Sequence, residues 1–295
     1  MKQLNEVADL PTTFGSPLFA GNRPEADDDV VAQVRRQGGI VLGKTNVPEH
    51  GFGATTTNPL FGATGNPFDP ALSAGASTGG GAVGVATGMA PYATGSDFAG
   101  SLRTPAAFCG IAGHRPSNGI VGTRRRADAW SAFDMEGPMA RCAADCKRLL
   151  AAMARQDPGD PLSVAPEERL FAPPETVPLA ELRVAVSEDL GFAPICEAYR
   201  ALFRDRLARI GHLFHRVMAA APDLSGATAC FMTLRGVGFV ADFGPMEAEF
   251  GARLGPVVLD ELARARGLTC AEIGQAQKDR GFTATLCASS RRMTC

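Results

Sequence analysis

Two glycine-rich segments of this 295-residue chain carry hydroxyl side chains in positions that suit covalent chemistry. In the first, Ser77 and Thr78 lie between Gly75 and the glycines at 79–81, where the backbone can approach a ligand closely. In the second, Ser101 follows small residues just before an expected helix, whose N-terminal N–H groups and dipole would stabilise a developing oxyanion. Ser101 is therefore a candidate nucleophile, although a glycine-serine cluster taken alone is more typical of a flexible loop.

A third segment matches the sequence pattern of a different kind of site. Residues 38–45 match the phosphate-binding pattern G-x-x-x-x-G-K-[ST] of nucleotide hydrolases. That site needs a strand before the loop and a helix that begins at the lysine. Here a helix is expected before the segment, the loop is three apolar residues, and Pro48 breaks any helix after Lys44. The sequence therefore disfavours a nucleotide site.

The elements that would position these loops follow one another in the manner of an α/β protein. A helix is indicated over residues 25–37, because Pro24 opens it and Gly38 and Gly39 end it. The apolar residues 40–42 then indicate a short buried strand. Further elements are expected as a helix over 80–90, a strand over 92–94, a loop-to-helix step over 98–109, a helix over 141–154, a strand over 182–186 and helices near 197–210 and 245–266.

The segments around the two serines resemble the amidase signature family. The consensus of that family is close to GGSSGGS followed by G-[ST]-D-x-G-G-S-[IL]-R-x-P-A-A-F-C-G. Because several blocks match in the same order, a chance match is implausible, and the chain is identified as a member of the family. The matching blocks are GASTGGG at 75–81, GSDFAGSLRTPAAFCG at 95–110, LPTTFGSP at 10–17, GKTNVPE at 43–49, NPL at 58–60 and GPMAR at 137–141.

The resemblance implies a fold and a set of catalytic residues. The fold would be the α/β amidase signature fold, with a central mixed twisted sheet flanked by helices on both faces, incomplete here. Ser101 would be the nucleophile, and Ser77 the bridging serine, held by a cis peptide bond after Ala76. The third residue in the family is a lysine upstream of the LPTTFGSP block, and the lysine in that place is Lys2.

The chemistry of these residues requires an uncharged amine. A serine hydroxyl is a poor nucleophile until a base takes its proton, and lysine would be that base here. Because an ordinary lysine has a pKa of about 10.4, the site must desolvate Lys2 to keep it neutral near pH 7. The resemblance also implies that the backbone N–H groups of Phe98, Ala99, Gly100 and Ser101 hold the oxyanion.

Other charged residues in the matching blocks are expected to serve the structure. Asp97 and Arg103 are expected to form an ion pair, and Lys44 is expected to hold a loop at the end of a strand. The basic run at 124–126 is interpreted as a solvated turn.

Composition excludes several classes of function. The formal net charge is −2 and the two signs are intermixed, so no nucleic-acid partner is expected. The N-terminus lacks the apolar segment of a signal peptide, and no apolar run approaches the roughly 20 residues that span a bilayer, so a cytoplasmic protein is expected. The resemblance implies no metal and no organic cofactor. The expected partner is a small-molecule amide, and a homodimer is left open.

Both ends of the chain depart from the family, whose members are considerably longer. Residues 1–280 are interpreted as a partial amidase signature domain, in which Lys2 would stand at a terminus that frays. Residues 281–295 are interpreted as an aberrant tail without helical periodicity. Codons exist for this tail that, read two bases later, spell an apolar and aromatic helix, so a frameshift is the hypothesis.

The sequence predicts hydrolysis of the C–N bond of a carboxylic acid amide to the acid and ammonia or an amine. The reaction would pass through an acyl-enzyme at Ser101, with Ser77 as the relay and Lys2 as the base. Two alternatives stay open: a catalytically inactive amidase fragment that only binds, and the glutaminase-type subunit of a tRNA-dependent amidotransferase. The loops that select the amide lie outside the matching blocks, so the sequence names no substrate.

Overall fold

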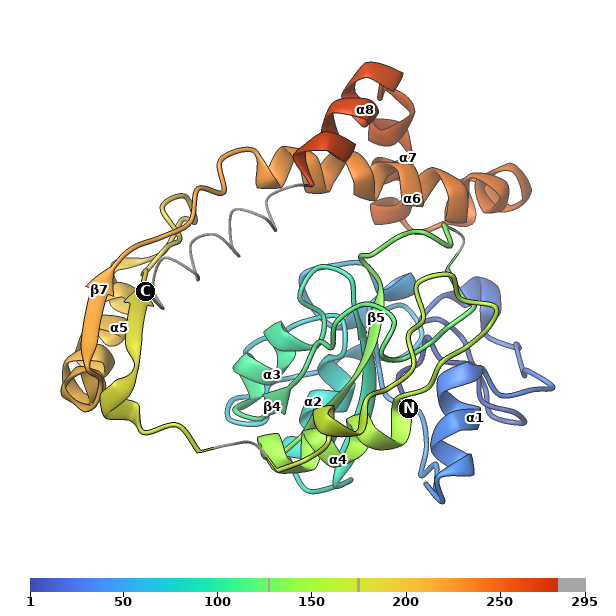
Figure 1. Ribbon diagram of the computed structural model, residues 1–295. Coiled ribbons are helices and arrows are strands. Elements are labelled where there is room, and N and C mark those ends of the chain that lie inside the picture. Colours follow the sequence, from blue (N-terminus) through green and yellow to red (C-terminus); the bar gives the residue numbers. More distant parts are fainter. Residues whose placement is uncertain (127, 174–175, 281–295) are drawn as a thin grey trace. The chain divides into compact units, whose positions relative to one another are not determined.

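The computed structural model describes residues 1–126, 128–173 and 176–280, which form two compact units (Figure 1). Of the described residues, the first unit contains 1–172 and 241–262, and the second contains 173–240 and 263–280. The single partial domain expected over 1–280 stays a prediction. The aberrant tail expected over 281–295 lies outside the described residues.

A three-stranded antiparallel sheet lies at the centre of the first unit. Its strands are β3 (Tyr92–Asp97), β5 (Met135–Ala140) and β4 (Ala112–Gly113), in the order β3-β5-β4. All six residues of β5 are buried, which is why this strand reads as continuously apolar or small apart from Glu136. The register places Ser96 directly opposite Glu136. A separate hairpin is formed by β1 (Thr57–Asn58) and β2 (Gly62–Ala63).

Two apolar clusters pack helices of the first unit around this sheet. Helix α2 (Gly79–Ala86) packs on β3 and β5, and helix α3 (Arg103–Cys109) packs on α2 and β4. Small side chains in this cluster allow close approach of the backbones. Helices α1 (Asp29–Arg36) and α4 (Ala143–Met153) share a second cluster. The first cluster contains Ala74, Ala82, Val85, Ala93, Leu102, Ala106, Cys109 and Met139, and the second contains Val7, Val30, Val31, Val34, Val121, Leu149 and Met153.

Helix α1 begins four residues later than the sequence predicts. The start was placed at Glu25 after Pro24, but Asp28 is the N-cap, and its carboxylate accepts the N–H of Val31 at 3.1 Å. A side-chain acceptor satisfies a backbone donor that would otherwise lack a partner at the helix end, whereas proline only tolerates the position. The predicted start is therefore wrong.

The buried strand predicted over residues 40–42 is also wrong. Ile40 is 85% exposed and Leu42 is 72% exposed, and the segment has no strand partner among the described residues. The pairing in this region comes three residues later, where Thr45 forms a parallel bridge with Lys2. An apolar triplet indicates burial only where another element covers it, and that depends on partners distant in sequence.

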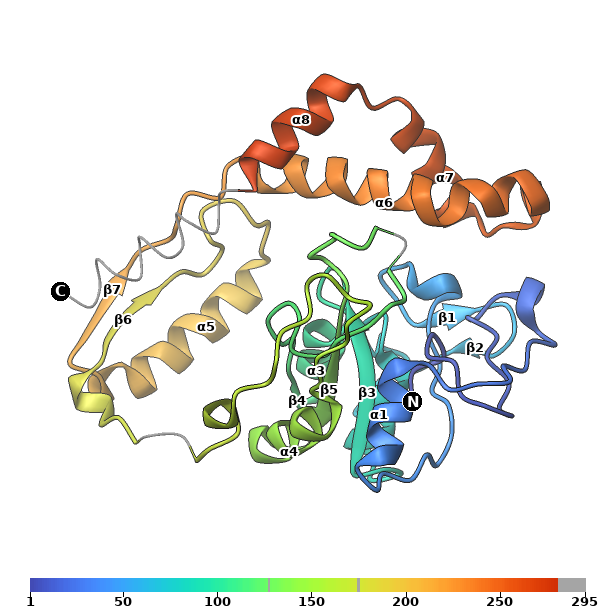
Figure 2. The ribbon, with the colours of Figure 1, turned by 45° about the vertical axis from the view of Figure 1, so that its right-hand side comes forward.

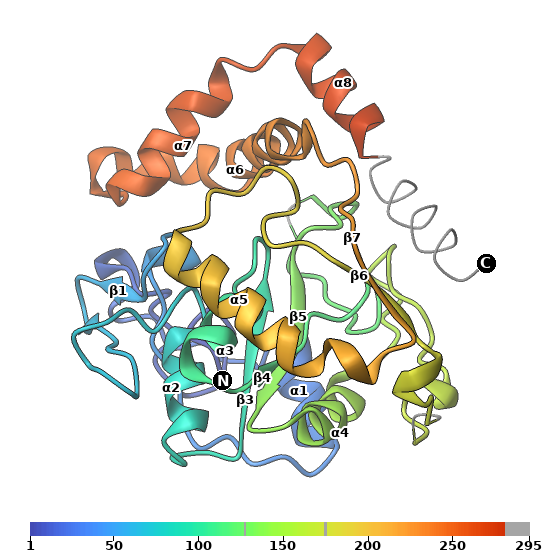
Figure 3. The same cartoon turned by 90° about the vertical axis from the view of Figure 1, so that its left-hand side faces the viewer.

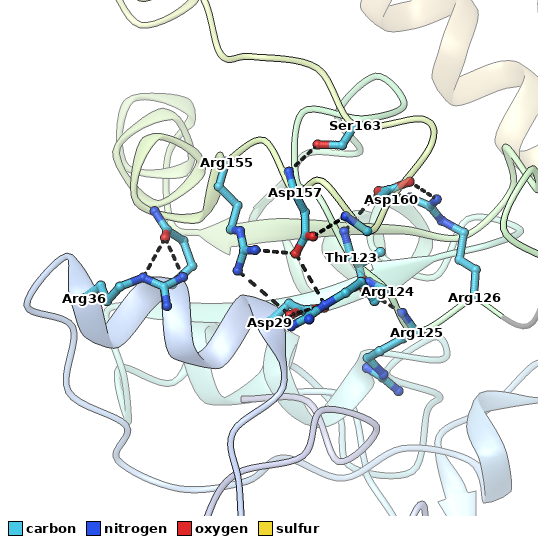
Figure 4. Close-up of polar contacts among 12 residues, drawn as sticks. Asp29, Arg36, Thr123, Arg124, Arg125, Arg126, Arg155, Asp157, Asp160 and Ser163 are labelled. Atoms are coloured by element: carbon cyan, nitrogen blue, oxygen red, sulfur yellow. Dashed lines mark hydrogen bonds and ion pairs between the residues drawn. The ribbon is translucent and has the colours of Figure 1, made fainter.

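The basic run at 124–126 is a set of ion pairs, so its interpretation as a solvated turn is wrong. Figure 4 shows Arg124 directed at Asp29 and Arg126 directed at Asp160. The pair of Arg126 and Asp160 is bidentate, with N···O distances of 2.8 and 3.0 Å. These pairs fasten the loop before β5 to the first turn of α1 and to the loop after α4. The sequence showed the charges but not these partners, because Asp29 lies 95 residues from Arg124 and Asp160 lies 34 residues from Arg126.

The second unit contains a parallel pair of strands and a helical segment. Helix α5 (Glu197–Ile210) is the crossover between β6 (Arg183–Val186) and β7 (Arg216–Ala219) (Figure 3). The last helices are α6 (Ala227–Phe250), α7 (Pro256–Arg266) and α8 (Cys270–Asp279). The end of α6 and most of α7 lie within residues 241–262, which belong to the first unit. The α8 helix lies along the first half of α6 (Figure 2), where the Cys230 thiol donates to the carbonyl of Ala276.

A helix start near Pro245 was predicted and is wrong, because α6 begins at Ala227 and contains Pro245. Within the described ranges no helix is long and apolar enough to cross a membrane. Short 3-10 turns occur at Pro17–Phe19, Glu49–Gly51, Glu168–Leu170, Leu179–Glu181, Gly211–Leu213 and Gly251–Arg253.

We expect the buried pair of Arg126 and Asp160 to be important for stability. Their side chains are 4% and 0% exposed, so Asp160→Asn leaves the guanidinium buried without a counter-charge. The free energy of unfolding should fall by about 3 kcal/mol, measured by urea denaturation. The matched control is Asp205→Asn, which removes an exposed i,i+4 pair with Arg209 and should cost less than about 0.5 kcal/mol. Equal losses in the two variants would contradict the assignment.

Candidate active site

Lys2 is fully buried and held by main-chain pairing, so the expectation that it stands at a fraying terminus is wrong. The N–H of Gln3 donates to the carbonyl of Thr45 at 3.1 Å, and the N–H of Thr45 donates to the carbonyl of Met1 at 2.9 Å. The N–H of Asn5 then donates to the carbonyl of Lys2 at 3.0 Å and closes a turn. Hydrogen bonds on both sides of Lys2 therefore fix its backbone.

The amine of Lys2 lies against two hydroxyl groups. Its Nζ atom is 2.8 Å from Ser77 Oγ, 2.8 Å from Ser96 Oγ and 3.3 Å from the carbonyl oxygen of Ser96. The structure thus brings together Lys2 and Ser77, which are 75 residues apart in the sequence. Sequence reasoning missed Ser96, although its hydroxyl occupies the [ST] position of the G-[ST]-D motif and could have been found there.

Burial controls the protonation of this amine. Desolvation lowers the pKa of Lys2 to about 8, against the opposing effect of the nearby carboxylates of Glu136, Asp134 and Asp97. The guanidinium of Arg125 lowers the pKa further. The amine is therefore much closer to its neutral form at pH 7 than a solvated lysine is.

The two serine-bearing loops contact each other through their backbones. Ser77 follows a cis peptide bond after Ala76, and the next N–H, that of Thr78, donates to the carbonyl of Ser101 at 3.2 Å. Ser77 is 3% exposed and Ser101 is half-buried, so the second serine is the one accessible to a substrate. This hydrogen bond joins the backbone of the candidate nucleophile to the residue that follows Ser77, whose hydroxyl contacts Lys2.

Close packing of the backbone at Gly80 fixes the position of the first loop. A Cβ atom on Gly80 would lie 2.4 Å from the backbone nitrogen of Asn46, and the N–H of Gly80 donates to the carbonyl of Asn46 at 3.3 Å. Any side chain at this position would displace the loop from residues 43–49. The glycine is therefore needed for close approach of two backbones.

Asp97 organises the second loop from a fully buried position. Its carboxylate accepts the N–H of Gly100 at 2.7 Å and the N–H of Leu102 at 3.2 Å, and two bonds of 3.0 Å from Arg103. Burial alone would raise the pKa of Asp97, but the hydrogen bonds from Arg103 and Gly100 outweigh it and hold this pKa below its usual value. The ion pair predicted between Asp97 and Arg103 is confirmed.

The carboxylate of Asp97 excludes one of the four expected oxyanion donors, the N–H of Gly100. The N–H of Gly100 is occupied by Asp97, because a short acidic side chain bonds readily to backbone donors a few residues on. The N–H groups of Ala99 and Ser101 donate to no acceptor in the part of the chain that is described. The ring of Phe98 packs against Phe133, with 5.3 Å between centroids. The oxyanion roles of Phe98, Ala99 and Ser101 stay predictions.

Lys44 holds a loop, as the sequence predicts. Its amine donates to the carbonyl of Asn5 and, at 2.7 Å, to the hydroxyl of Thr12. No helix begins at Lys44, so the phosphate-binding geometry is absent over residues 38–51, all of which are described.

A cluster of aromatic rings that sequence reasoning did not find lies beside Ser77. The His50 ring contacts Phe19 and Phe243, with centroids 5.9 and 5.4 Å apart, and burial lowers the pKa of His50 to about 4, so the ring is neutral. A Cβ atom on Gly51 would lie 3.7 Å from Ser77 Oγ, which places this segment against the site. No sequence pattern links these rings, because Phe243 comes from α6.

Comparison with known proteins decides the family. The amidase family model matches residues 1–234 of the chain. The chain belongs to the amidase signature family. An acylamidase of Rhodococcus erythropolis is 34% identical over 283 residues, which are 95% of this chain and 59% of that protein. A glutamyl-tRNA(Gln) amidotransferase subunit of Chromohalobacter salexigens is 43% identical over 154 residues, 52% of this chain and 32% of that protein. The chain thus spans well under two thirds of the length of these relatives.

Solved structures share the fold, and one of them is an amidase signature enzyme. A bacterial aryl acylamidase of the family superposes with a TM-score of 0.87 at 22% identity, covering 99% of this chain and 63% of that one. A 6-aminohexanoate cyclic dimer hydrolase superposes with a TM-score of 0.79 at 27% identity, covering 96% and 62%. The amidase signature fold predicted from the sequence is confirmed. In the described residues its strands form a three-stranded antiparallel sheet and a hairpin in one unit and a parallel pair in the other.

We expect Gly80→Ala to displace the loop that carries Ser77. The added methyl group would overlap the backbone of Asn46, so the free energy of unfolding should fall by about 2 kcal/mol or more. The control is Gly84→Ala in the same helix, where a Cβ atom meets nothing within 4 Å and the better helix former should raise stability by up to about 1 kcal/mol. Thermal unfolding of both variants gives the comparison, and a stable Gly80→Ala protein would refute the close contact.

Proposed function

We propose that this chain hydrolyses the C–N bond of a carboxylic acid amide, with Ser101 as nucleophile, Ser77 as relay and Lys2 as base. The observation that carries the proposal is the buried amine of Lys2 at 2.8 Å from the hydroxyl of Ser77, in a chain 34% identical to an acylamidase. A desolvated amine that contacts a serine is the activating arrangement that a serine nucleophile needs. The backbone hydrogen bond between Thr78 and Ser101 supports the assignment of Ser101 as the nucleophile, because it joins the two loops.

The proposed reaction balances its protons through one relay. Neutral Lys2 takes the proton of Ser77 as Ser77 takes the proton of Ser101, and the Ser101 oxygen forms a bond to the carbonyl carbon. The tetrahedral intermediate then collapses and the C–N bond breaks, while the proton returns through Ser77 to the departing amine. Water hydrolyses the acyl-enzyme in a second round of the same relay and releases the acid.

The proposed oxyanion hole uses backbone donors of the loop between β3 and α3. Donors from Ala99 and Ser101, with Phe98 as a third, would stabilise the oxyanion by about 3 kcal/mol for each well-placed bond. Asp97 contributes by fixing the loop rather than by contacting the substrate, since its carboxylate is occupied by Gly100, Leu102 and Arg103.

We further propose that the substrate is a small amide and that the protein acts in the cytoplasm. The proposed steps use side-chain and backbone groups alone, so they call for no metal or organic cofactor, and no nucleic-acid partner is proposed. The homodimer left open by the sequence stays a prediction.

A second candidate is the glutaminase-type subunit of a tRNA-dependent amidotransferase. Several glutamyl-tRNA(Gln) amidotransferase subunits are 35–43% identical to this chain, over 52–78% of its length. The acylamidase match is longer, at 95% of the chain, and favours the first candidate. Ammonia release from free glutamine, compared with release from simple aryl and alkyl amides, separates the two.

We expect Ser101→Ala to abolish covalent labelling by a fluorophosphonate probe and to lower amide hydrolysis roughly ten-thousandfold. The side chain that forms the acyl-enzyme is lost, while the fold should be kept, because Ser101 is half-buried and small. The control is Ser117→Ala at an exposed position, which should be labelled like the wild type. Folded wild-type protein that is neither labelled nor active would instead support the inactive, binding-only fragment.

We expect the rate of amide hydrolysis to rise as Lys2 loses its proton. Because the base must be neutral and its pKa is about 8, kcat/KM should rise about tenfold per pH unit below pH 8 and level off above it. Lys2→Met should lower the plateau by roughly two to four orders of magnitude and remove this dependence. A profile that is flat between pH 6 and 9 in the wild type would rule out Lys2 as the base.

A further inference from the structure

One buried carboxylate next to the site has no part in the proposed relay. Glu136 lies on β5 directly opposite Ser96 on β3, and Ser96 accepts two hydrogen bonds from the amine of Lys2. Side chains of directly opposed residues in an antiparallel pair lie on the same face of the sheet, roughly 5 Å apart at Cβ. The register therefore places Glu136 on the same face of the sheet as Ser96, the residue that contacts the amine of Lys2.

The contacts of Glu136 fix one of its oxygen atoms and leave the other open. Its Oε1 atom accepts the amide of Asn5 at 3.0 Å and lies 3.4 Å from the guanidinium of Arg125. Its Oε2 atom is buried and accepts no hydrogen bond from any residue that the structure describes. The whole residue is only 5% exposed. A buried carboxylate oxygen without a donor is costly, so its retention calls for a reason.

We propose that Glu136 is a positioning residue that stabilises the ammonium form of Lys2 during the proton relay, an inference that rests on the proposed function. When Lys2 accepts the proton of Ser77 it becomes a buried cation, whose solvation the site must replace. The carboxylate supplies the counter-charge, much as the acid of a serine-protease triad stabilises the imidazolium that forms during attack. Glu136 thereby makes Lys2 a stronger base without contacting the substrate.

The surrounding charges are consistent with this role. Around Lys2 the carboxylates of Glu136, Asp134 and Asp97 favour the cation, Glu136 most strongly, and Arg125 opposes it. Around Glu136, burial raises its pKa to about 7, Arg125 lowers it, and Lys2 lowers it less.

Two further carboxylates, those of Asp134 and Asp28, raise the pKa of Glu136. Lys2 and Glu136 thus titrate in overlapping ranges, and the pair loses its protons in two shared steps. Above about pH 7 the ionised carboxylate is in place to hold the proton on Lys2.

The chain allows a direct measurement of this coupling, because it contains only four lysines, at positions 2, 44, 147 and 278. Their side-chain signals can be followed by NMR in protein labelled with 13C-lysine and assigned with single lysine-to-arginine variants. The titration of Lys2 is then compared in the wild type, Glu136→Gln and Glu136→Asp. This readout needs no substrate and no catalytic activity.

We expect Glu136→Gln to lower the pKa of Lys2 by roughly one unit, the low end of the effect of a nearby opposite charge. Glu136→Asp keeps the charge one methylene further away and should give a value between those of the wild type and Glu136→Gln. If Glu136→Gln does not fold, Glu136→Asp alone must still move the pKa downward.

The matched control is Glu6→Gln. Glu6 raises the pKa of Lys44, so its removal should lower the pKa of Lys44 and leave that of Lys2 in place. An unchanged pKa of Lys2 in both Glu136 variants, or an equal shift in Glu6→Gln, would overturn the inference.

The kinetic consequence separates this inference from the proposed function. In Glu136→Gln the acid limb of kcat/KM should move to lower pH with Lys2, and the plateau should fall roughly three- to tenfold, as expected for a base weakened by about one unit. Inactivity of wild-type protein would defeat the proposed function while the NMR titration still tested the coupling. An active wild type whose acid limb does not move in Glu136→Gln would defeat the inference alone.

Discussion

The burial of one amine is the constraint on which the candidate site depends. An ammonium group removed from water without compensation is prohibitively costly, so a buried lysine needs acceptors, nearby negative charge or a lowered pKa. Lys2 has all three: two hydroxyls and a carbonyl as acceptors, carboxylates nearby, and a pKa lowered to about 8. Each acceptor comes from a different part of the chain than Lys2 itself, so the folded unit and the neutral base require one another.

The same logic explains how the loop after β3 is built. Asp97 is buried and must satisfy its own charge, which it does with Arg103 and with two backbone donors. This use of the Gly100 N–H fixes the loop but removes that donor from any oxyanion site. A carboxylate that shapes a turn and the oxyanion of a substrate compete for the same N–H groups, and here the carboxylate takes one of them.

What could be predicted from the sequence was local. The helices α2 and α3, the strand β3 and the loop serines Ser77 and Ser101 follow from short motifs and from small-residue patterns. Two of the failures depend on distant partners: the exposed triplet at 40–42 has no covering element among the described residues, and Arg124 and Arg126 pair with carboxylates 95 and 34 residues away.

The fixed backbone of Lys2 belongs with these failures, because its bridge partner Thr45 lies more than 40 residues away. Ser96 was missed for a different reason. Its position in the motif was visible, but only the fold shows that its hydroxyl and its carbonyl face the same amine.

The charges behind the amine extend the site to the start of α1. Asp28 caps that helix, yet its second oxygen accepts the side chain of Asn5, whose amide also reaches Glu136. Arg125 lies between these two carboxylates, 3.2 Å from Asp28 and 3.4 Å from Glu136. A helix cap, a strand residue and a loop arginine thus share one network of charges. Because the network sets the field at Lys2, a change in the packing of α1 would reach the base through charge rather than through contact with the substrate.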